Sequence, residues 1–234
     1  MTTDLDQVRK DLERVAEPAY RKKIAELVPT GVTIIGVRVP AIRKLAQGWH
    51  QANKDVTPEF ALDLLESAFE RRCREELLFT IFVLARLKRK NTPAHLESID
   101  PLIDKIEDWE VCDQLSMTVI GEIVAGAPEE AARLEKWAQS ENRWRRRAAV
   151  ASTTALNQKG RRLTGPTLQI CRHVMAERDA GVKKAVGWAL REATKSDPEA
   201  VYRFLLEWKS TAAPRILNEG SQKLTAGQRK AILR

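Results

Sequence analysis

Apolar residues recur at helical spacing along almost the whole chain, and this pattern limits the fold more than any other feature of the sequence. Segments such as FALDLLESAF, EELLFTIFVLARL and LSMTVIGEIV place apolar side chains three or four residues apart, as in a helix with one buried face. Alternation with period two, which would indicate strands, is nearly absent. The sequence therefore predicts an all-α fold.

Prolines and glycines divide this pattern into segments of roughly 10 to 18 residues, a normal helix length. The breakers that we expect between helices are Pro58, Pro93, Pro101, Pro128, Gly160, Pro166, Pro198 and Pro214. One β-branched run, GVTIIGVRVP at residues 31–40, contains two glycines and ends in proline. Glycine and proline at these positions favour an irregular connection between helices over a strand.

Four of the expected helices open in the same way. They start near Glu70, Trp109, Asn142 and Gly181 with polar or charged residues and continue with apolar and small ones, and the starts are 39, 33 and 39 residues apart. Such a period is typical of helical-pair repeats, whereas a simple bundle predicts no recurring openings. We therefore predict a HEAT-like α-solenoid of stacked antiparallel helix pairs, a single domain over residues 1–234. Its curvature would create a concave groove lined by the second helix of each pair.

Composition excludes several classes of protein. No stretch approaches the roughly 18 consecutive apolar residues of a membrane span, and the beginning, MTTDLDQVRKDLERV, is charged where a signal peptide would be apolar. We expect a monomeric cytoplasmic protein, associated with the nucleoid in a prokaryote. Cysteines and histidines lie too far apart for a disulfide framework or a zinc pattern, at Cys73, Cys112, Cys171, His50, His95 and His173. We expect reduced, packing cysteines and neither a metal nor another cofactor.

Positive charge is concentrated in one sector of the sequence. Residues 141–191 contain twelve Lys or Arg against three acids, a net charge of +9, while the whole chain carries +8, so the remaining residues sum to −1. Such a concentration attracts polyanions, with nucleic acid as the first candidate. A solvated basic face without a ligand is the alternative.

Trp109 and Asp113 lie four residues apart in the stretch DWEVCDQL, so a helix would bring both side chains to one face. Asp113 has apolar neighbours, where a carboxylate is costly unless it is paired. It could form a salt bridge to an arginine of the next repeat, or it could stabilise a cation in a basic groove. Trp109 could be an apolar anchor between repeats, or an aromatic platform for a sugar or a cation.

The next two recurring helices carry the basic residues. The segment NRWRRRAAV offers arginines whose planar guanidinium groups suit phosphate, and KKAVGWALREA places position 184 on one face with positions 188 and 191. We expect Trp144 to pack inward and the arginines to point out. The candidate phosphate-binding residues are Arg145, Arg146, Arg147, Lys183, Lys184 and Arg191, with Trp188 as a second aromatic platform or, equally, an anchor between repeats.

Four segments together resemble one known family. GVRVPAIRKLA, DWEVCDQLS, ENRWRRRAAV and KKAVGWALREATKSDP, in this order and spacing, are similar to the AlkD-like DNA alkylation repair glycosylases, HEAT-like repeat proteins. The resemblance runs from about residue 15 to 208. It implies excision of positively charged alkylated purines, such as 3-methyladenine and 7-methylguanine and also bulkier adducts, from double-stranded DNA in base excision repair. An abasic site would remain, and the base would not be flipped into a pocket.

The resemblance also implies roles for particular residues. The catalytic aspartate of the family falls on Asp113, the two sugar-contacting tryptophans on Trp109 and Trp188, and the phosphate-contacting arginine on Arg147. Leu27 stands near the position where the family usually has an aromatic residue, and the C-terminal APRILNEGSQKL differs from the usual basic ending. Two rival functions stay open: a non-catalytic HEAT-repeat protein that binds damaged or branched DNA, and a protein-interaction scaffold.

Overall fold

A computed structural model describes residues 5–158 and 160–234 of the chain, and its regular structure there is helical. The prediction of an all-α fold is confirmed. The helices gather in two compact units, of which the first ends at Val119 and the second begins at Ile120. The single domain that we expect over residues 1–234 stays a prediction, as does the concave groove.

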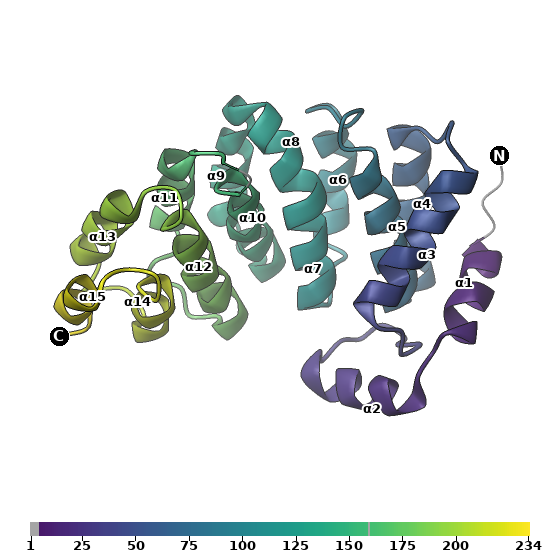
Figure 1. The fold of residues 1–234 in the computed structure, drawn as a ribbon, viewed down its shortest axis with the longest axis horizontal. Coiled ribbons are helices and arrows are strands. Elements are labelled where there is room, and N and C mark those ends of the chain that lie inside the picture. Colours follow the sequence, from purple (N-terminus) through teal and green to yellow (C-terminus); the bar gives the residue numbers. More distant parts are fainter. Residues whose placement is uncertain (1–4, 159) are drawn as a thin grey trace. The chain divides into compact units, whose positions relative to one another are not determined.

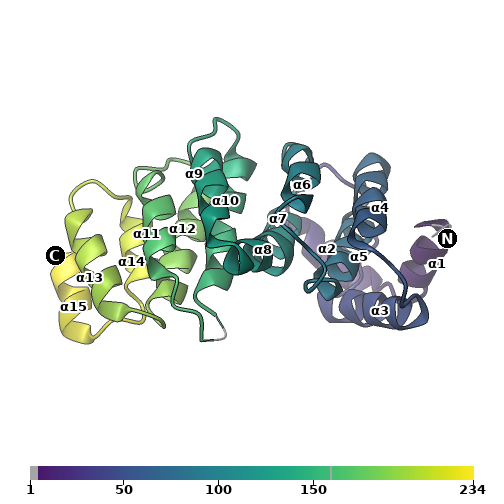
Figure 2. The ribbon, with the colours of Figure 1, turned by 90° about the horizontal axis from the view of Figure 1, so that it is seen from above.

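The first unit holds seven α-helices in its described part: α1 (Leu5–Arg14), α2 (Pro18–Leu27), α3 (Val39–Ala52), α4 (Pro58–Arg71), α5 (Arg74–Arg86), α6 (His95–Ile103) and α7 (Trp109–Leu115). Helix α5 packs against α3, α4 and α7, while α4 packs against α6. Two layers result, with α3, α5 and α7 in one and α4 and α6 in the other, as Figure 1 and Figure 2 show.

A π-helical segment, Ser116–Ile120, continues α7 into the second unit. There follow α8 (Gly121–Gly126), a short 3-10 turn (Pro128–Glu130), α9 (Ala131–Ala138), α10 (Arg143–Leu156), α11 (Thr164–Arg172), α12 (Ala180–Ala193), α13 (Pro198–Glu207), α14 (Pro214–Gly220) and α15 (Ala226–Leu233). Contacts run from α8 to α10, α12 and α14 in one layer, and from α9 to α11, α13 and α15 in the other. Each unit is thus a stack of helix pairs.

The four recurring segments of the sequence correspond to α5, α7, α10 and α12, which lie in the same kind of layer within their units. Small residues permit this stacking. A Cβ atom on Gly187 of α12 would approach Glu219 of α14 to 2.7 Å, so the close contact between these helices depends on glycine. The recurring openings therefore predicted these four helices, although the first opening, at Glu70, lies at the end of α4, and α5 begins at Arg74.

Most breakers lie where the sequence predicted them. Pro58, Pro198 and Pro214 each begin a helix, where the missing N–H of proline costs nothing. Pro101 was wrongly expected to separate helices, because it lies inside α6. Four buried apolar residues of this nine-residue helix, Leu96, Ile99, Leu102 and Ile103, provide packing that offsets the lost hydrogen bond.

The β-branched run at residues 31–40 is an irregular connection up to residue 38, as predicted, with one isolated bridge between Thr33 and Cys73. The buried carboxylate of Glu75 accepts hydrogen bonds from the backbone N–H groups of Ile35, Gly36 and Val37 at 2.9, 3.0 and 3.3 Å. Gly36 has a φ of +100°, a conformation that suits glycine. One acidic side chain therefore replaces the hydrogen bonds that a strand would have made.

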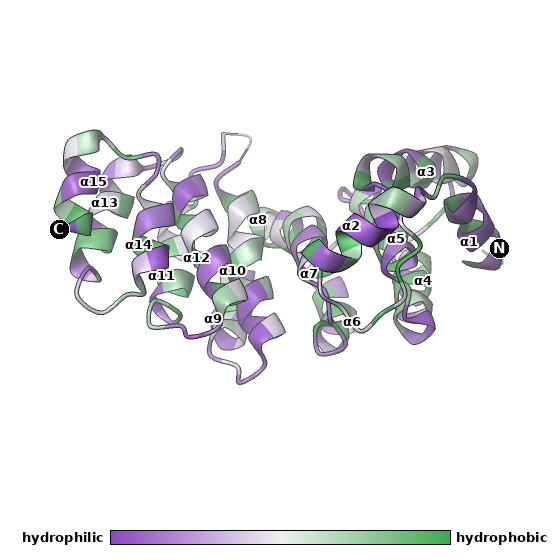
Figure 3. Cartoon of the chain, turned by 90° about the horizontal axis from the view of Figure 1, so that it is seen from below, coloured by the Kyte–Doolittle hydropathy of each residue, from purple (hydrophilic) through white to green (hydrophobic). Residues whose placement is uncertain are grey.

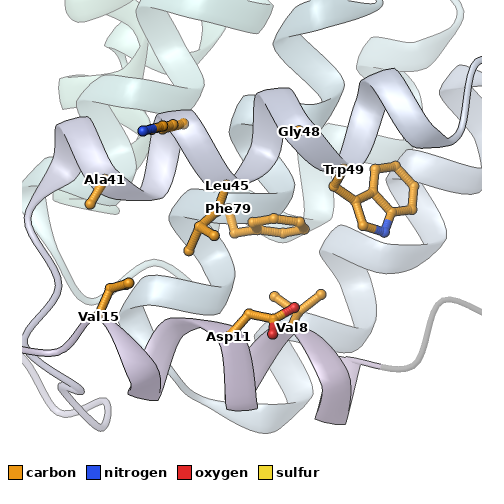
Figure 4. Close-up of a pocket in the computed structure, with 9 residues that line it drawn as sticks. Val8, Asp11, Val15, Ala41, Leu45, Gly48, Trp49 and Phe79 are labelled. Carbon is orange, nitrogen blue, oxygen red and sulfur yellow. The ribbon is translucent and has the colours of Figure 1, made fainter.

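Hydrophilic residues dominate α1 in Figure 3, and only a few of its residues are apolar. A cavity of about 480 Å³ lies between α1 and the helices α3 and α5. Figure 4 shows Trp49 and Phe79 on one side of this cavity, with Val8 and Asp11 on the other. All three cysteines are free and buried, which confirms their predicted packing role. Among the described residues, we find neither a helix able to cross a membrane nor a cluster of side chains suited to a metal ion.

Candidate functional site

The first part of the candidate site is α7, whose N-cap residue is Asp108. The Asp108 carboxylate accepts hydrogen bonds from the backbone N–H groups of Glu110 at 2.6 Å and Val111 at 3.2 Å. The chain therefore turns helical at Trp109, and Asp113 follows one turn later on the same face. The predicted pairing of these two side chains on one helix face is confirmed.

Trp109 and Asp113 have different surroundings. Trp109 is half-buried, and its indole Nε1 donates a hydrogen bond to the carbonyl oxygen of Leu27 at 3.5 Å, at the end of α2. Leu27 itself is 60% exposed. Asp113 is only 8% exposed and lies on α7 between the buried residues Cys112 and Leu115. A carboxylate so nearly removed from water interacts strongly with any charge close to it.

The second part of the site is the start of α10. Its N-cap Asn142 accepts a hydrogen bond from the backbone N–H of Trp144 at 2.9 Å. Trp144 is half-buried, and the Arg143 guanidinium lies over its ring at 4.6 Å from the centroid. Arg145 is half-buried on the same turn.

Two arginines of α10 are held by other parts of the second unit. Arg146 forms an ion pair with Glu177 at 2.6 Å and donates to the carbonyl oxygens of Ser140 and Glu141. Arg147 donates to the carbonyl oxygen of Gly181, at the start of α12. Its exposed fraction is 4%, so the expectation that it points outward was wrong. Position 147 shares the inward face with the buried residues Val150 and Ala151, because residues three and four apart are neighbours on a helix.

Helix α12 carries the remaining candidates and packs against α10. Its N-cap Asp179 accepts hydrogen bonds from the backbone N–H groups of Gly181 and Val182. Burial raises the pKa of the Asp179 carboxyl, but these hydrogen bonds and the charge of Arg143 outweigh burial and lower the pKa. Lys184 is exposed, while Lys183 and Trp188 are half-buried. Arg191 is tied to Glu219 and Gln222 of α14 and the turn after it, each at 3.1 Å.

Three of the four residues singled out by the resemblance now have a defined local setting: Trp109 and Asp113 share one face of α7, and Arg147 joins α10 to α12. Trp188, the fourth, stands one turn after Lys184 on α12. The first two belong to the first unit and the others to the second. Their action on one ligand belongs to the proposal below.

Comparison with known proteins bears on what this arrangement serves. The family described as DNA alkylation repair enzyme matches residues 8–224, most of the chain. The chain belongs to this family of DNA alkylation repair enzymes. The AlkD-like resemblance that the four sequence segments indicated is thereby confirmed at the level of the family.

Solved structures of the same fold agree with the family. A predicted DNA alkylation repair enzyme from Enterococcus faecalis is 18% identical, with a TM-score of 0.77 over 90% of this chain and 97% of that one. AlkD2 from Streptococcus mutans is also 18% identical, with a TM-score of 0.64 over 95% of this chain and 98% of that one. None of the curated proteins matches the chain. At this identity, the two structures support the all-α fold of this alkylation repair family member.

Sequence reasoning missed several residues around α7 of this family member. The buried Arg74 and Asp108 form an ionic cluster with the half-buried Glu110 at the beginning of the helix. Asp108 could have been found, since an aspartate immediately before a helical segment is a common N-cap. Arg74 could not, because Asp108 and Glu110 lie more than thirty residues away from it along the chain.

Proposed function

We propose that this protein is a monofunctional DNA glycosylase that excises positively charged alkylated purines from double-stranded DNA and leaves an abasic site. Membership of the DNA alkylation repair family supports a repair role on DNA. The observation that carries the proposal further is Asp113, a carboxylate 8% exposed and one helical turn from Trp109. The protein would act as a monomer in the cytoplasm, at the nucleoid of a prokaryote.

The chemistry suits a single carboxylate. An alkylated purine with a positive charge is a good leaving group, because the electron pair of the breaking N-glycosidic bond neutralises the base. The deoxyribose is left as an oxocarbenium-like cation, which the Asp113 carboxylate would stabilise electrostatically. Water then adds to C1′ of the sugar and releases its proton to the solvent, with Asp113 orienting the attack. The reaction needs neither a general acid for the base nor a redox partner.

The aromatic and basic residues would hold the substrate. Trp109 and Trp188 would present their π-faces to the sugar cation. Lys184 is exposed and carries the charge that a phosphate requires, with Lys183 beside it. Arg145 would anchor a phosphate next to the lesion, without a pocket for a flipped base. Arg147 would have to leave the carbonyl oxygen of Gly181 before it could do the same. Arg146 and Arg191 would have to exchange the partners Glu177 and Glu219 for a phosphate.

The test is release of free base from methylated duplex DNA. We expect the wild-type protein to release 3-methyladenine and 7-methylguanine, identified by chromatography, and a second duplex with a bulky adduct would measure the tolerated size. Asp113→Asn should lose at least about 100-fold in the single-turnover rate, because it removes the charge facing the cation. Its affinity for unmodified duplex should stay within a factor of two.

A matched control separates loss of chemistry from loss of charge. Asp100→Asn changes a half-buried aspartate of α6 in the same unit, and we expect its rate to equal that of the wild type. If Asp113→Asn released base as fast as the wild-type protein, the catalytic role of Asp113 would be refuted.

A second candidate is a non-catalytic protein that binds damaged or branched DNA. The observation that favours it is the net charge of +9 over residues 141–191, which attracts DNA with or without catalysis. It predicts salt-dependent binding without release of base from any alkylated duplex. A protein-interaction scaffold predicts no measurable affinity for DNA even at low salt.

A further inference from the structure

Arg74 is a fully buried arginine at the first position of α5, which packs against α7. Its guanidinium faces three carboxylates. Nε lies 3.1 Å from a carboxylate oxygen of Asp108, Nη1 lies 3.4 Å from Glu75, and Nη2 forms an ion pair with Glu110. Since Glu75 is already engaged by the backbone of residues 35–37, the charge of Arg74 serves mainly Asp108 and Glu110.

Asp108 and Glu110 flank Trp109 in the sequence. The Arg74 guanidinium therefore contacts the residue before Trp109 and the residue after it. Asp108 is at the same time the N-cap of α7, with one oxygen on backbone N–H groups and the other toward Arg74. The position of the first turn of α7 is therefore fixed from outside the helix. Asp113 follows on the next turn. It lies close enough to Glu110 for its charge to contribute to the raised pKa of the Glu110 carboxyl.

This cluster is a costly way to hold a helix. Burial raises the pKa of Asp108 and of Glu110, and the charge of Arg74 opposes that rise in both. Buried ion pairs add little net stability, because removing charges from water costs about as much as their attraction returns. Asp108 alone would cap α7. What the guanidinium adds is one rigid, planar group that hydrogen-bonds Glu110 and forms an ion pair with Asp108, and contact with both residues restricts the orientation of the helix start.

We infer that Arg74 is a positioning residue for Trp109 and Asp113, acting through Asp108 and Glu110. The inference rests on the proposed function, because it assigns Arg74 a part in the same reaction without contact to DNA. Reacting groups must be held to within a fraction of an ångström, and a misplacement of about 1 Å lowers rates about 100-fold.

The variant that tests this inference is Arg74→Lys. Lysine keeps the positive charge but cannot reach Asp108 and Glu110 with a planar fork. We expect the single-turnover excision rate to fall about 10- to 100-fold, while the affinity for unmodified duplex changes less than twofold. Glu110→Gln removes the charge that pairs with Arg74 and keeps the volume of the side chain. It should give a smaller loss of the excision rate.

Arg71→Lys is the matched control. Arg71 pairs with the buried carboxylate of Glu76 and with Asp6 of α1, so it belongs to a similar ionic cluster of the same unit that does not include α7. We expect a smaller loss of stability than in Arg74→Lys, because the Arg71 side chain is 31% exposed, and an unchanged excision rate per folded molecule. A rate loss in Arg74→Lys no larger than that in Arg71→Lys would overturn the inference, as would a loss that merely follows the folded fraction.

A readout without activity separates this inference from the proposed function. With 5-fluorotryptophan incorporated, the ¹⁹F resonance of Trp109 is identified by its absence in Trp109→Phe. Arg74→Lys should shift or broaden this resonance, whereas Arg71→Lys should leave it in place. If the wild-type protein released no base, the proposed glycosylase would fail while the displacement of Trp109 would still be tested. An unchanged Trp109 resonance in Arg74→Lys would refute the positioning role.

Discussion

At the scale of single residues, burial decides which side chains can react. Asp113 and Arg147 both carry ionisable groups and are nearly inaccessible. Asp113 lies one turn after Trp109 on α7, and Arg147 donates to the carbonyl oxygen of Gly181 at the start of α12. Cys73 and Cys171 are equally buried, but no part of the proposed chemistry uses them. Burial thus strengthens the electrostatic interactions of the candidate site and makes the thiols unreactive.

The thiols provide a prediction at this scale. Burial raises the pKa of Cys73 to about 11 and that of Cys171 to about 12. At pH 8, the fraction of molecules in which either thiol is ionised to the reactive thiolate is therefore on the order of one thousandth or less. We expect neither to react with Ellman's reagent within minutes in the native protein. All three cysteines should react in denaturant. Rapid modification of Cys171 in the native state, located by mass spectrometry, would contradict this burial.

At the scale of helices, sequence reasoning succeeded where a period of 3.6 residues decides the outcome. The recurring openings identified α5, α7, α10 and α12, and the four-residue spacing correctly placed Trp109 and Asp113 on one face. It failed for Pro101, where packing outweighed the lost hydrogen bond. It also failed for the direction of Arg147, because the face that a helix buries depends on its neighbours.

The cluster around Arg74 shows the other limit of sequence reasoning. Its members come from α5, from the residue before α7 and from α7 itself, so only the packing of α5 against α7 brings them together. The local signal of Asp108 as an N-cap was present in the sequence. Nothing in the spacing of Arg74 and Asp108 indicates that the two would meet.

The connection between α10 and the turn before α12 leads to a pH-dependent prediction. Burial raises the pKa of the Glu177 carboxyl, but hydrogen bonds from Arg146 and from the backbone N–H groups of Asp179 and Arg178 outweigh it and lower the pKa. A lowered pKa in the folded state means that the stabilisation is present above the unfolded value of about 4.3 and is lost as pH falls through the folded one. Glu177→Gln should therefore lower the free energy of unfolding by about 2 to 4 kcal/mol at pH 7.

Urea unfolding at several pH values measures this effect. The difference between wild type and Glu177→Gln should shrink as pH falls below the unfolded pKa of about 4.3, and it should be lost once pH has fallen through the lower pKa of Glu177 in the folded protein. The control is Glu207→Gln, which removes an exposed ion pair with Arg172 and should change stability by less than about 1 kcal/mol. A difference that stayed constant down to pH 3 would show that the charge of Glu177 does not contribute.

At the scale of the whole molecule, charge and chemistry are distributed differently along the chain. The net +9 of residues 141–191 belongs to the second unit, whereas Trp109 and Asp113 belong to the first. Under the proposed function, the second unit would supply most of the attraction to DNA, and the first would supply the carboxylate that faces the sugar cation. Affinity for DNA and rate of excision should then respond to different substitutions.

Salt dependence tests this division. Each phosphate contact releases condensed counterions, so the logarithm of the binding constant falls with the logarithm of salt concentration by about 0.9 per contact. The double variant Lys183→Glu with Lys184→Glu should reduce this slope by about 1 to 2 and weaken binding to methylated and unmodified duplexes equally, because phosphate contacts carry no information about the base. Fluorescence anisotropy from 50 to 300 mM salt measures the slope.

The control is Lys136→Glu, which changes an exposed residue of α9 in the other layer of the same unit. It should leave the slope unchanged. Lys136→Glu changes the net charge by −2 and the double variant by −4. A loss in Lys136→Glu of half that in the double variant would therefore show that binding follows net charge alone and that α12 has no particular part in it.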